Sequence, residues 1–137
     1  MAAPTTPTTV TLRNSSGDTA MLVSSTYGGV PKAIQSGGES SEFQQDTSLN
    51  SFGSVVYAIG NIATWVVVWT ANNQVAISIL PAGAPIVWTD IWDKIQRDNA
   101  HDSYTTSYGW KYDSAARIES NGDAQVLIAS IVALPPN

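Results

Sequence analysis

The chain has 137 residues, a length that suits one domain with one hydrophobic core. Hydrophobic residues make up 43% and charged residues only 12%, a composition that excludes an intrinsically disordered chain and a coiled coil. The net charge is −5, with six lysines and arginines in total. This charge excludes a basic nucleic-acid interface and disfavours binding to anionic membrane surfaces.

The sequence contains no cysteine, so the fold needs no disulfide and the compartment is not fixed by redox state. No apolar run is long enough to span a membrane, and no basic segment precedes an apolar signal-peptide core. We therefore expect a cytoplasmic protein, or a secreted one if a signal peptide has been removed. The sequon Asn14-Ser15-Ser16 is expected to be a chance match rather than a used glycosylation site.

Short strand-like segments separated by turn residues fill the first part of the chain. An extended arm rich in proline and threonine is expected over 1–9, followed by a single domain over 10–134. The predicted strands cover 10–13, 19–25, 41–45 and 53–59, and a polar loop is predicted over 46–53. Strands this short at this spacing indicate a β-sandwich or a barrel.

The strongest strand signal lies in the segment 64–80, which is predicted to form a central β-hairpin. Asn72 and Asn73 suit a two-residue turn, which would pair Thr70 with Val75. This register places Val66, Val68, Ile77 and Ile79 on one face, the aliphatic face. Trp65 and Trp69 lie on the other, the tryptophan face. We expect the aliphatic face to be buried between two sheets and the tryptophan face to be covered by another element.

The hydrophobic period then changes from that of a strand to that of a helix. Four apolar residues recur at helical spacing: Trp88, Ile91, Trp92 and Ile95. Thr89 suits the N-cap and Asp90 the first turn, so one short amphipathic helix is predicted over about 89–98. Its apolar stripe is the natural cover for the tryptophan face of the hairpin.

The remaining chain reads as a loop over 99–103 and closing strands over 105–112, 115–120 and 124–134. Asn121 and Gly122 suit a hairpin turn between the last two strands. The predicted fold class is therefore mainly β: an antiparallel β-sandwich with one short amphipathic helix packed on a sheet face.

Catalytic chemistry has little support in the sequence. His101 is the only histidine, it lies in a polar stretch where a solvated side chain is expected, and no G-x-S-x-G elbow is present. A metal site would have to rely on carboxylates, and no phosphate-binding glycine motif occurs. The acids that could serve as a catalytic pair are Asp90, Asp93, Asp98, Asp102 and Asp113, at spacings that a polar helix face and its flanking loops also give. We expect no enzyme activity, no cofactor and no metal.

The most informative polar stretch is 103–112, which is rich in aromatic residues. Its ligand-binding candidates are Tyr104, Tyr108, Trp110 and Tyr112. In a continuous strand they would share one face, and Gly109 would allow a bulge. Aromatic side chains with one polar end suit a membrane interface, a sugar face or a choline cation. The alternative is that the same row belongs to the sandwich core.

The order of several weak motifs resembles one known family. The motifs are Asn14-x-x-Gly17-Asp18-Thr19, Gly28-Gly29, Gly53-Ser54-Val55-Val56-Tyr57, Trp65-x-x-x-Trp69-Thr70, Tyr108-Gly109-Trp110 and Ala116-x-Ile118. Over about 10–131 this series resembles the 23-kDa jasmonate-induced protein family of plants. That family is similar to nakanori-type fungal lipid binders and, by fold, to the actinoporin-like β-sandwiches.

The resemblance implies an actinoporin-like sandwich with a role in stress and defence. Its fold relatives bind sphingomyelin–cholesterol membranes or sugars, and an aromatic patch holds phosphocholine in actinoporins. Tyr104, Tyr108, Trp110 and Tyr112 look similar to that patch. The segment 1–9 lacks the amphipathic helix of pore-forming actinoporins, so pore formation by this chain alone is not expected.

Three functions follow as alternatives. The first is a non-catalytic, defence-type protein that recognises membrane lipid headgroups of the phosphocholine or sphingomyelin kind. The second is a carbohydrate-binding lectin, and the third is an interaction domain whose exposed aromatics meet a second copy of the chain. The expected partner is thus a zwitterionic membrane lipid or a glycan, with a homo-oligomer as a further option and no nucleic acid.

Overall fold

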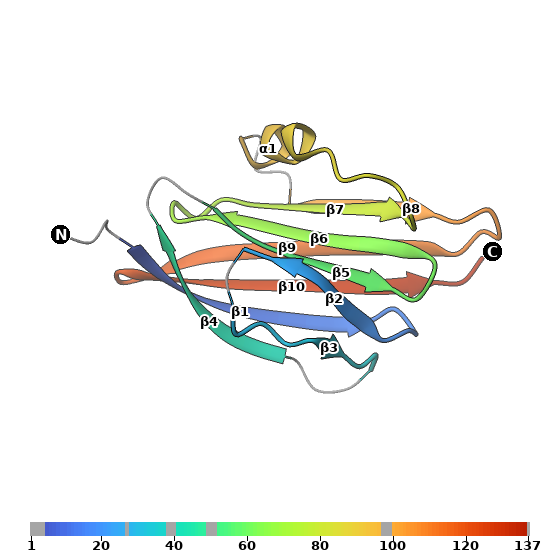
Figure 1. Cartoon of the computed structure of the whole chain (residues 1–137), viewed down its shortest axis with the longest axis horizontal. Helices are drawn as coiled ribbons and strands as arrows, with labels where there is room; N and C mark the ends of the chain where they lie inside the picture. Colours follow the sequence, from blue (N-terminus) through green and yellow to red (C-terminus); the bar gives the residue numbers. More distant parts are fainter. Residues whose placement is uncertain (1–4, 27, 38–40, 49–51, 97–99, 137) are drawn as a thin grey trace.

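The computed structural model describes residues 5–26, 28–37, 41–48, 52–96 and 100–136. They form two five-stranded sheets packed face to face, with a helix on the outer face of one sheet (Figure 1). The chain is therefore the mainly β sandwich with one short helix that the sequence predicts.

In chain order the elements are β1 (Thr5–Ser15), β2 (Ala20–Ser25), β3 (Ala33–Ile34), β4 (Ser41–Ser48), β5 (Phe52–Ile59), β6 (Ala63–Thr70), β7 (Val75–Pro81), α1 (Trp88–Gln96), β8 (His101–Thr105), β9 (Lys111–Asn121) and β10 (Ala124–Leu134). The first sheet has the order β4-β1-β10-β9-β8 and the second the order β3-β2-β5-β6-β7. The described strand pairs are antiparallel apart from β1 and β10, which run parallel.

Two of the N-terminal strands, β1 and β4, are longer than predicted. β1 begins at Thr5 because its first residues pair with β4, and Thr8 also pairs with Gln125 of β10. β4 continues to Ser48, so the predicted polar loop over 46–53 is wrong at its start. The end of β4 was not predicted because its inward-facing residues there are polar rather than hydrophobic. Thr47, for example, is buried and its hydroxyl shares a hydrogen bond of 3.2 Å with that of Thr8.

The central hairpin forms, but its register differs by one residue from the prediction. The amide of Thr70 donates to the carbonyl of Gln74 at 3.0 Å, and Trp69 pairs with Val75. The loop is therefore three residues long, and its last residue, Asn73, has a φ of 59°. This geometry is typical of a three-residue hairpin loop that ends in the left-handed region. The predicted pairing of Thr70 with Val75 is wrong for this reason.

The two faces of β6 are exchanged relative to the prediction. Trp65 and Trp69 are buried between the sheets, whereas Val66 and Val68 lie under α1. On β7, Ile77 and Ile79 do face the opposite sheet, as predicted. The helix thus covers the valines and the small side chain of Ala76, and the tryptophans fill the core.

Both core tryptophans satisfy their indole N–H groups across the sandwich. Trp65 donates to the hydroxyl of Ser114 at 2.8 Å, and Trp69 donates to the hydroxyl of Thr47 at 3.0 Å. Gly53 lies opposite Trp69 on β5, and a Cβ added there would come within 2.3 Å of the indole ring. The inward orientation satisfies both indole N–H groups with hydroxyl acceptors. At Trp69 it also uses the space that Gly53 leaves by having no side chain.

The helix begins at Trp88, one residue earlier than predicted. Thr89 therefore lies in the first turn and is not the N-cap, while the amide of Asp90 donates to the carbonyl of Val87 at 3.1 Å. The predicted end at Asp98 lies outside the described residues. No helix in the described part of the chain is long and apolar enough to cross a membrane.

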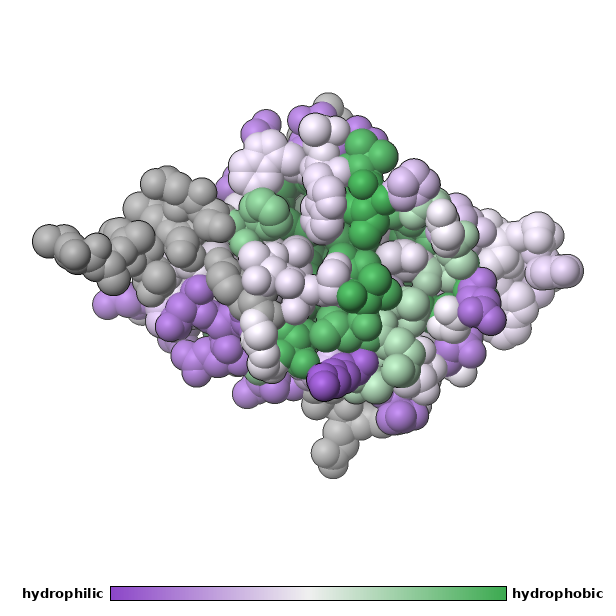
Figure 2. Space-filling view, viewed as in Figure 1, coloured by the Kyte–Doolittle hydropathy of each residue, from purple (hydrophilic) through white to green (hydrophobic). Residues whose placement is uncertain are grey.

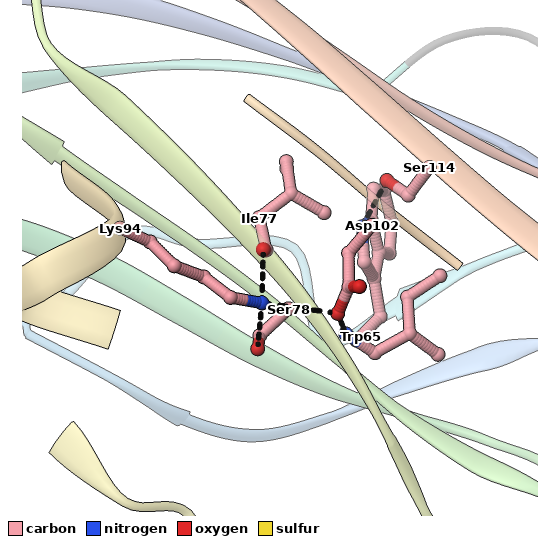
Figure 3. Close-up of polar contacts among 7 residues, drawn as sticks. Trp65, Ile77, Ser78, Lys94, Asp102 and Ser114 are labelled. Atoms are coloured by element: carbon pink, nitrogen blue, oxygen red, sulfur yellow. Dashed lines mark hydrogen bonds and ion pairs between the residues drawn. The ribbon is translucent and has the colours of Figure 1, made fainter. Parts of the chain in front are cut away.

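One ion pair holds the helix against the edge strand β7 of the second sheet (Figure 3). The ammonium group of Lys94 lies 3.2 Å from the carboxylate of Asp102 on β8 and also donates to the hydroxyl of Ser78 at 3.0 Å. The carbonyl of Ile77 accepts a further bond from Lys94 at 3.3 Å. The amide of Ile79 donates to Asp102 at 2.8 Å. These bonds occupy the free edge of β7 and join it to both α1 and β8.

A candidate binding site at one end of the sandwich

Three connections meet at the end of the sandwich that also carries the C-terminus (right in Figure 1). They are the connections between β1 and β2, between β5 and β6, and between β8 and β9. An open cavity of about 510 Å³ lies among them, a volume typical of small-molecule sites. Its lining residues are Ser16, Gly17, Asp18, Asn61, Ile62, Tyr104, Thr106, Ser107, Tyr108, Trp110 and Tyr112.

The chain reverses direction within the aromatic stretch, so the predicted continuous strand over 105–112 is wrong. The amide of Thr106 donates to the carbonyl of Trp110 at 2.8 Å, and the amide of Gly109 donates to the carbonyl of Thr106 at 3.0 Å. Gly109 has a φ of 89°, which closes a three-residue loop over 107–109. This hairpin loop belongs to the same kind as the one after β6.

The turn brings all four predicted site residues to the same cavity. Tyr104 and Tyr112 lie directly opposite each other in the register of β8 and β9. Tyr112 is only 4% exposed and belongs to the core, whereas Tyr104 is half-buried. Trp110 is 43% exposed and Tyr108 85% exposed. The cavity therefore has a buried tyrosine floor and an exposed aromatic rim.

The loop opposite the aromatic hairpin is held by one buried amide. The Nδ2 atom of Asn14 donates to the carbonyls of Asp18 at 2.7 Å and Ile34 at 2.9 Å. The Oδ1 atom of Asn14 accepts from the amide of Ser16 at 3.0 Å and from its hydroxyl at 2.6 Å. Because the Asn14 side chain is buried and fully engaged, the sequon that it begins is not open to glycosylation in the folded chain.

The cavity carries negative charge. Among the described residues that line it, Asp18 has the only formally charged side chain. Burial raises the pKa of Tyr112, and the negative charge of Asp18 raises that pKa further. Tyr112 therefore stays a neutral phenol at ordinary pH. The site can present a carboxylate, neutral hydroxyl groups and aromatic faces to a ligand.

A second aromatic cluster lies on the helix side of the molecule. The ring centroid of Phe52 is 6.3 Å from that of Trp88 and 6.1 Å from that of Trp92, with tilted planes. Beside these rings lies a shallow apolar cavity of about 320 Å³. Figure 2 shows hydrophobic residues gathered in a band on the face that carries α1. The described large hydrophobic residues exposed on β2, on α1 and just before α1 are Met21, Val23, Val87, Trp88 and Trp92.

Three of the other polar candidates, His101, Asp102 and Asp113, have partners outside the cavity. His101 lies in β8 rather than in a loop, and its Nε2 atom is 2.6 Å from a carboxylate oxygen of Asp113 on the surface. Asp102 is committed to Lys94 and to the edge of β7. Asp98 lies outside the described residues. Within the described ranges, no three His, Asp or Glu side chains form a group that could hold a metal ion.

The residues that sequence reasoning missed come from the other two connections. The segments 16–18 and 61–62 line the same cavity as the aromatic hairpin although they are far from it in the chain. The available signal was topological: in a sandwich, connections that follow strands of one direction cluster at one end. The turn residues Gly17 and Gly60 marked these loops, but nothing in the sequence joined them to the tyrosines.

The fold is a two-layer β-sandwich, and solved structures of a lipid-binding protein and of a lectin share this architecture. The lipid binding protein Nakanori superposes with a TM-score of 0.67 and 15% identity, covering 95% of this chain and 72% of Nakanori. The Xerocomus chrysenteron lectin XCL superposes with a TM-score of 0.54 and 14% identity, covering 93% of this chain and 99% of the lectin.

A substituted form of the same lectin gives a TM-score of 0.54 at 11% identity, covering 97% of this chain and all of the lectin chain. No family model matches the sequence, and no curated protein matches it. At these identities the likeness concerns the fold. The chain is thus similar in architecture to both a lipid-binding protein and a lectin.

Proposed function

We propose that this protein is a non-catalytic binding protein that recognises membrane lipid headgroups of the phosphocholine or sphingomyelin type in the end cavity. One observation carries the proposal: Tyr104, Tyr108, Trp110 and Tyr112 converge on a single open cavity. A choline cation over a tyrosine or tryptophan face gains roughly 0.5–2 kcal/mol per well-placed ring. The shared fold with a lipid-binding protein adds support.

The charge of the cavity predicts how this binding responds to salt. No lysine or arginine is among the lining residues, so attraction to the phosphate of a headgroup is not its source of affinity. Contacts between a cation and aromatic faces act over a short range. Binding to zwitterionic vesicles should therefore change little with salt, unlike binding driven by basic residues.

The alternative function is carbohydrate binding in the same cavity. Asp18 and Asn61 line it beside Trp110, so hydrogen-bonding groups for sugar hydroxyls stand next to an aromatic platform. The likeness to a lectin favours this second candidate. A glycan array identifies it directly. Light scattering tests the third option, in which the exposed aromatic rim meets a second copy.

The motif order over 10–131 also supports a place in the jasmonate-induced family, and with it a role in defence or the stress response. This part of the proposal rests on the sequence resemblance.

The test is vesicle flotation with phosphatidylcholine or sphingomyelin, with and without cholesterol, at low and high salt. We expect the wild-type protein to float with these vesicles at both salt concentrations. The variant Tyr108→Ala/Trp110→Ala, which removes the exposed rim, should lose binding. The matched control is Val23→Ala/Val87→Ala, which removes exposed apolar groups away from the cavity and should bind normally.

Two outcomes contradict the proposal. Absence of binding by the wild type on every lipid composition rejects the lipid function and favours the lectin. Binding that survives the Tyr108→Ala/Trp110→Ala substitution keeps the activity but moves the site. The segment 28–31 and the Trp88 cluster on α1 are then the next places to examine.

A further inference from the structure

Asp18 occupies a defined place at the edge of the end cavity. Its carbonyl accepts hydrogen bonds from the Nδ2 atom of Asn14 at 2.7 Å and from the hydroxyl of Ser16 at 3.1 Å. These bonds hold the backbone of the β1–β2 connection and leave the carboxylate uninvolved. The side chain can therefore be changed without breaking the contacts that fix the loop.

The carboxylate lies against the neighbouring β5–β6 turn, and Asp18 is one of the residues that line the cavity. A Cβ placed on Gly60 would be 3.4 Å from the carboxyl carbon of Asp18 and 3.6 Å from both of its oxygens. Its charge also reaches the buried floor, since it contributes to the raised pKa of Tyr112. Asp18 thus stands between a loop turn and the tyrosines.

In the described part of the chain no ion pair is found for this carboxylate, whereas Asp102 pairs with Lys94 and Asp113 with His101. Asp18 is half-buried, so a cationic ligand in the cavity would meet a carboxylate that no cation of the described chain already pairs with. The aromatic rings around the same cavity favour the same charge. Two independent features, the carboxylate and the rings, therefore select for one ligand chemistry.

We infer that Asp18 is the specificity-determining residue of this cavity and selects ligands that carry an ammonium cation, quaternary ammonium above all. The inference rests on the proposed function and narrows it. The cation of a choline headgroup sits between the Asp18 carboxylate and the aromatic rim, and the phosphate stays toward solvent, where no basic lining residue is needed. Headgroups that carry a phosphate without a cation are rejected.

The experiment separates the cation from its source. Free tetramethylammonium and phosphocholine are titrated into the protein by NMR, and flotation compares phosphatidylcholine with phosphatidylglycerol vesicles, whose headgroup lacks the cation. The variants are Asp18→Asn, which removes the charge at constant shape, and Asp18→Glu, which keeps it. Asp123→Asn, in the exposed β9–β10 turn, is the control for net charge.

We expect Asp18→Asn to weaken binding of both soluble cations by about tenfold or more, with Asp18→Glu and Asp123→Asn retaining most of the affinity. Asp18→Asn should also lower the pKa of Tyr112, which shows that the carboxylate acts within the cavity. Wild-type protein should float with phosphatidylcholine and not with phosphatidylglycerol.

Failure of the inference is distinguishable from failure of the proposed function. If Asp18→Asn binds the cations and phosphatidylcholine as the wild type does, while the rim variant Tyr108→Ala/Trp110→Ala does not, the function stands and the role of Asp18 is rejected. If the wild type binds no vesicle but binds tetramethylammonium in a way that depends on Asp18, the inference that Asp18 selects cations is supported and the membrane-binding function is rejected. Absence of tetramethylammonium binding rejects the inference.

Discussion

Two tryptophan pairs with the same spacing have opposite places in this molecule. Trp65 and Trp69 on β6 are buried between the sheets, and each indole N–H donates to a hydroxyl of the opposite sheet. Trp88 and Trp92 on α1 are 43% and 42% exposed and pack on the ring of Phe52 at the surface. The first pair builds the core, whereas the second forms part of an exposed apolar face.

The difference lies in what surrounds each pair. Residues four apart share a face in a strand and in a helix alike, so spacing does not decide which face is buried. In the core pair, each indole N–H has a hydroxyl acceptor. The ring of Trp69 also packs against Gly53, where a side chain would collide with it. The helix is anchored instead by Ile91 and Ile95, which leaves its tryptophans at the margin of the contact.

The largest expected effect is on stability, from substitution in the core pair. Trp69→Ala should lower the free energy of unfolding by about 3–5 kcal/mol, because it leaves a cavity and removes the hydrogen bond from the indole to Thr47. Trp88→Ala should cost about 1 kcal/mol or less, because that ring is half exposed. Urea denaturation of both variants measures the difference. Similar costs for the two variants would contradict the contrast between the pairs.

Alkaline pH should also act on the core and not on the helix. Burial raises the pKa of Tyr57 far above its usual value, and burial raises that of Tyr112 too. A raised pKa in the folded state means that stability is complete below the unfolded value of about 10 and falls as the pH rises above it. Unfolding followed by circular dichroism at increasing pH should show this loss. Tyr57→Phe should reduce its pH dependence, and an unchanged dependence would show that Tyr57 is not its source.

A smaller effect is expected where the helix meets the sheet edge. Asp102→Asn should lower stability by about 1 kcal/mol or less, because the pair with Lys94 is partly exposed and screened by salt. Hydrogen exchange should report faster opening of α1 with little change in β6. Faster exchange throughout both sheets would mean that Asp102 supports the whole fold.

Local patterns predicted much of the fold. β10 has the bounds that its alternating sequence indicates, and the helix follows from its apolar period. The lengths of two hairpin loops were not predicted correctly. Asn73 and Gly109 each end a three-residue loop, and its length is fixed by hydrogen bonds between the strands. The sequence also did not show which face of β6 points inward. The hydroxyl groups that accept from its tryptophans belong to Ser114 and Thr47, which are distant in the chain.

The candidate site was predictable only in part. Composition marked the aromatic stretch that supplies the four rings, and the structure gathers those rings around one cavity. Asp18 and Asn61 could not be assigned to it, because they enter through two other connections. Their contribution arises from the packing of the sheets, which brings three loop ends together.

We propose that the end cavity, and not the exposed helix face, binds the ligand. The most direct measurement compares vesicle flotation of Tyr108→Ala/Trp110→Ala with that of Trp88→Ala/Trp92→Ala, each removing two exposed aromatic rings. We predict that the first variant loses binding to phosphatidylcholine or sphingomyelin vesicles and that the second keeps it. Retention by the first and loss by the second would place the site on α1 and contradict the account.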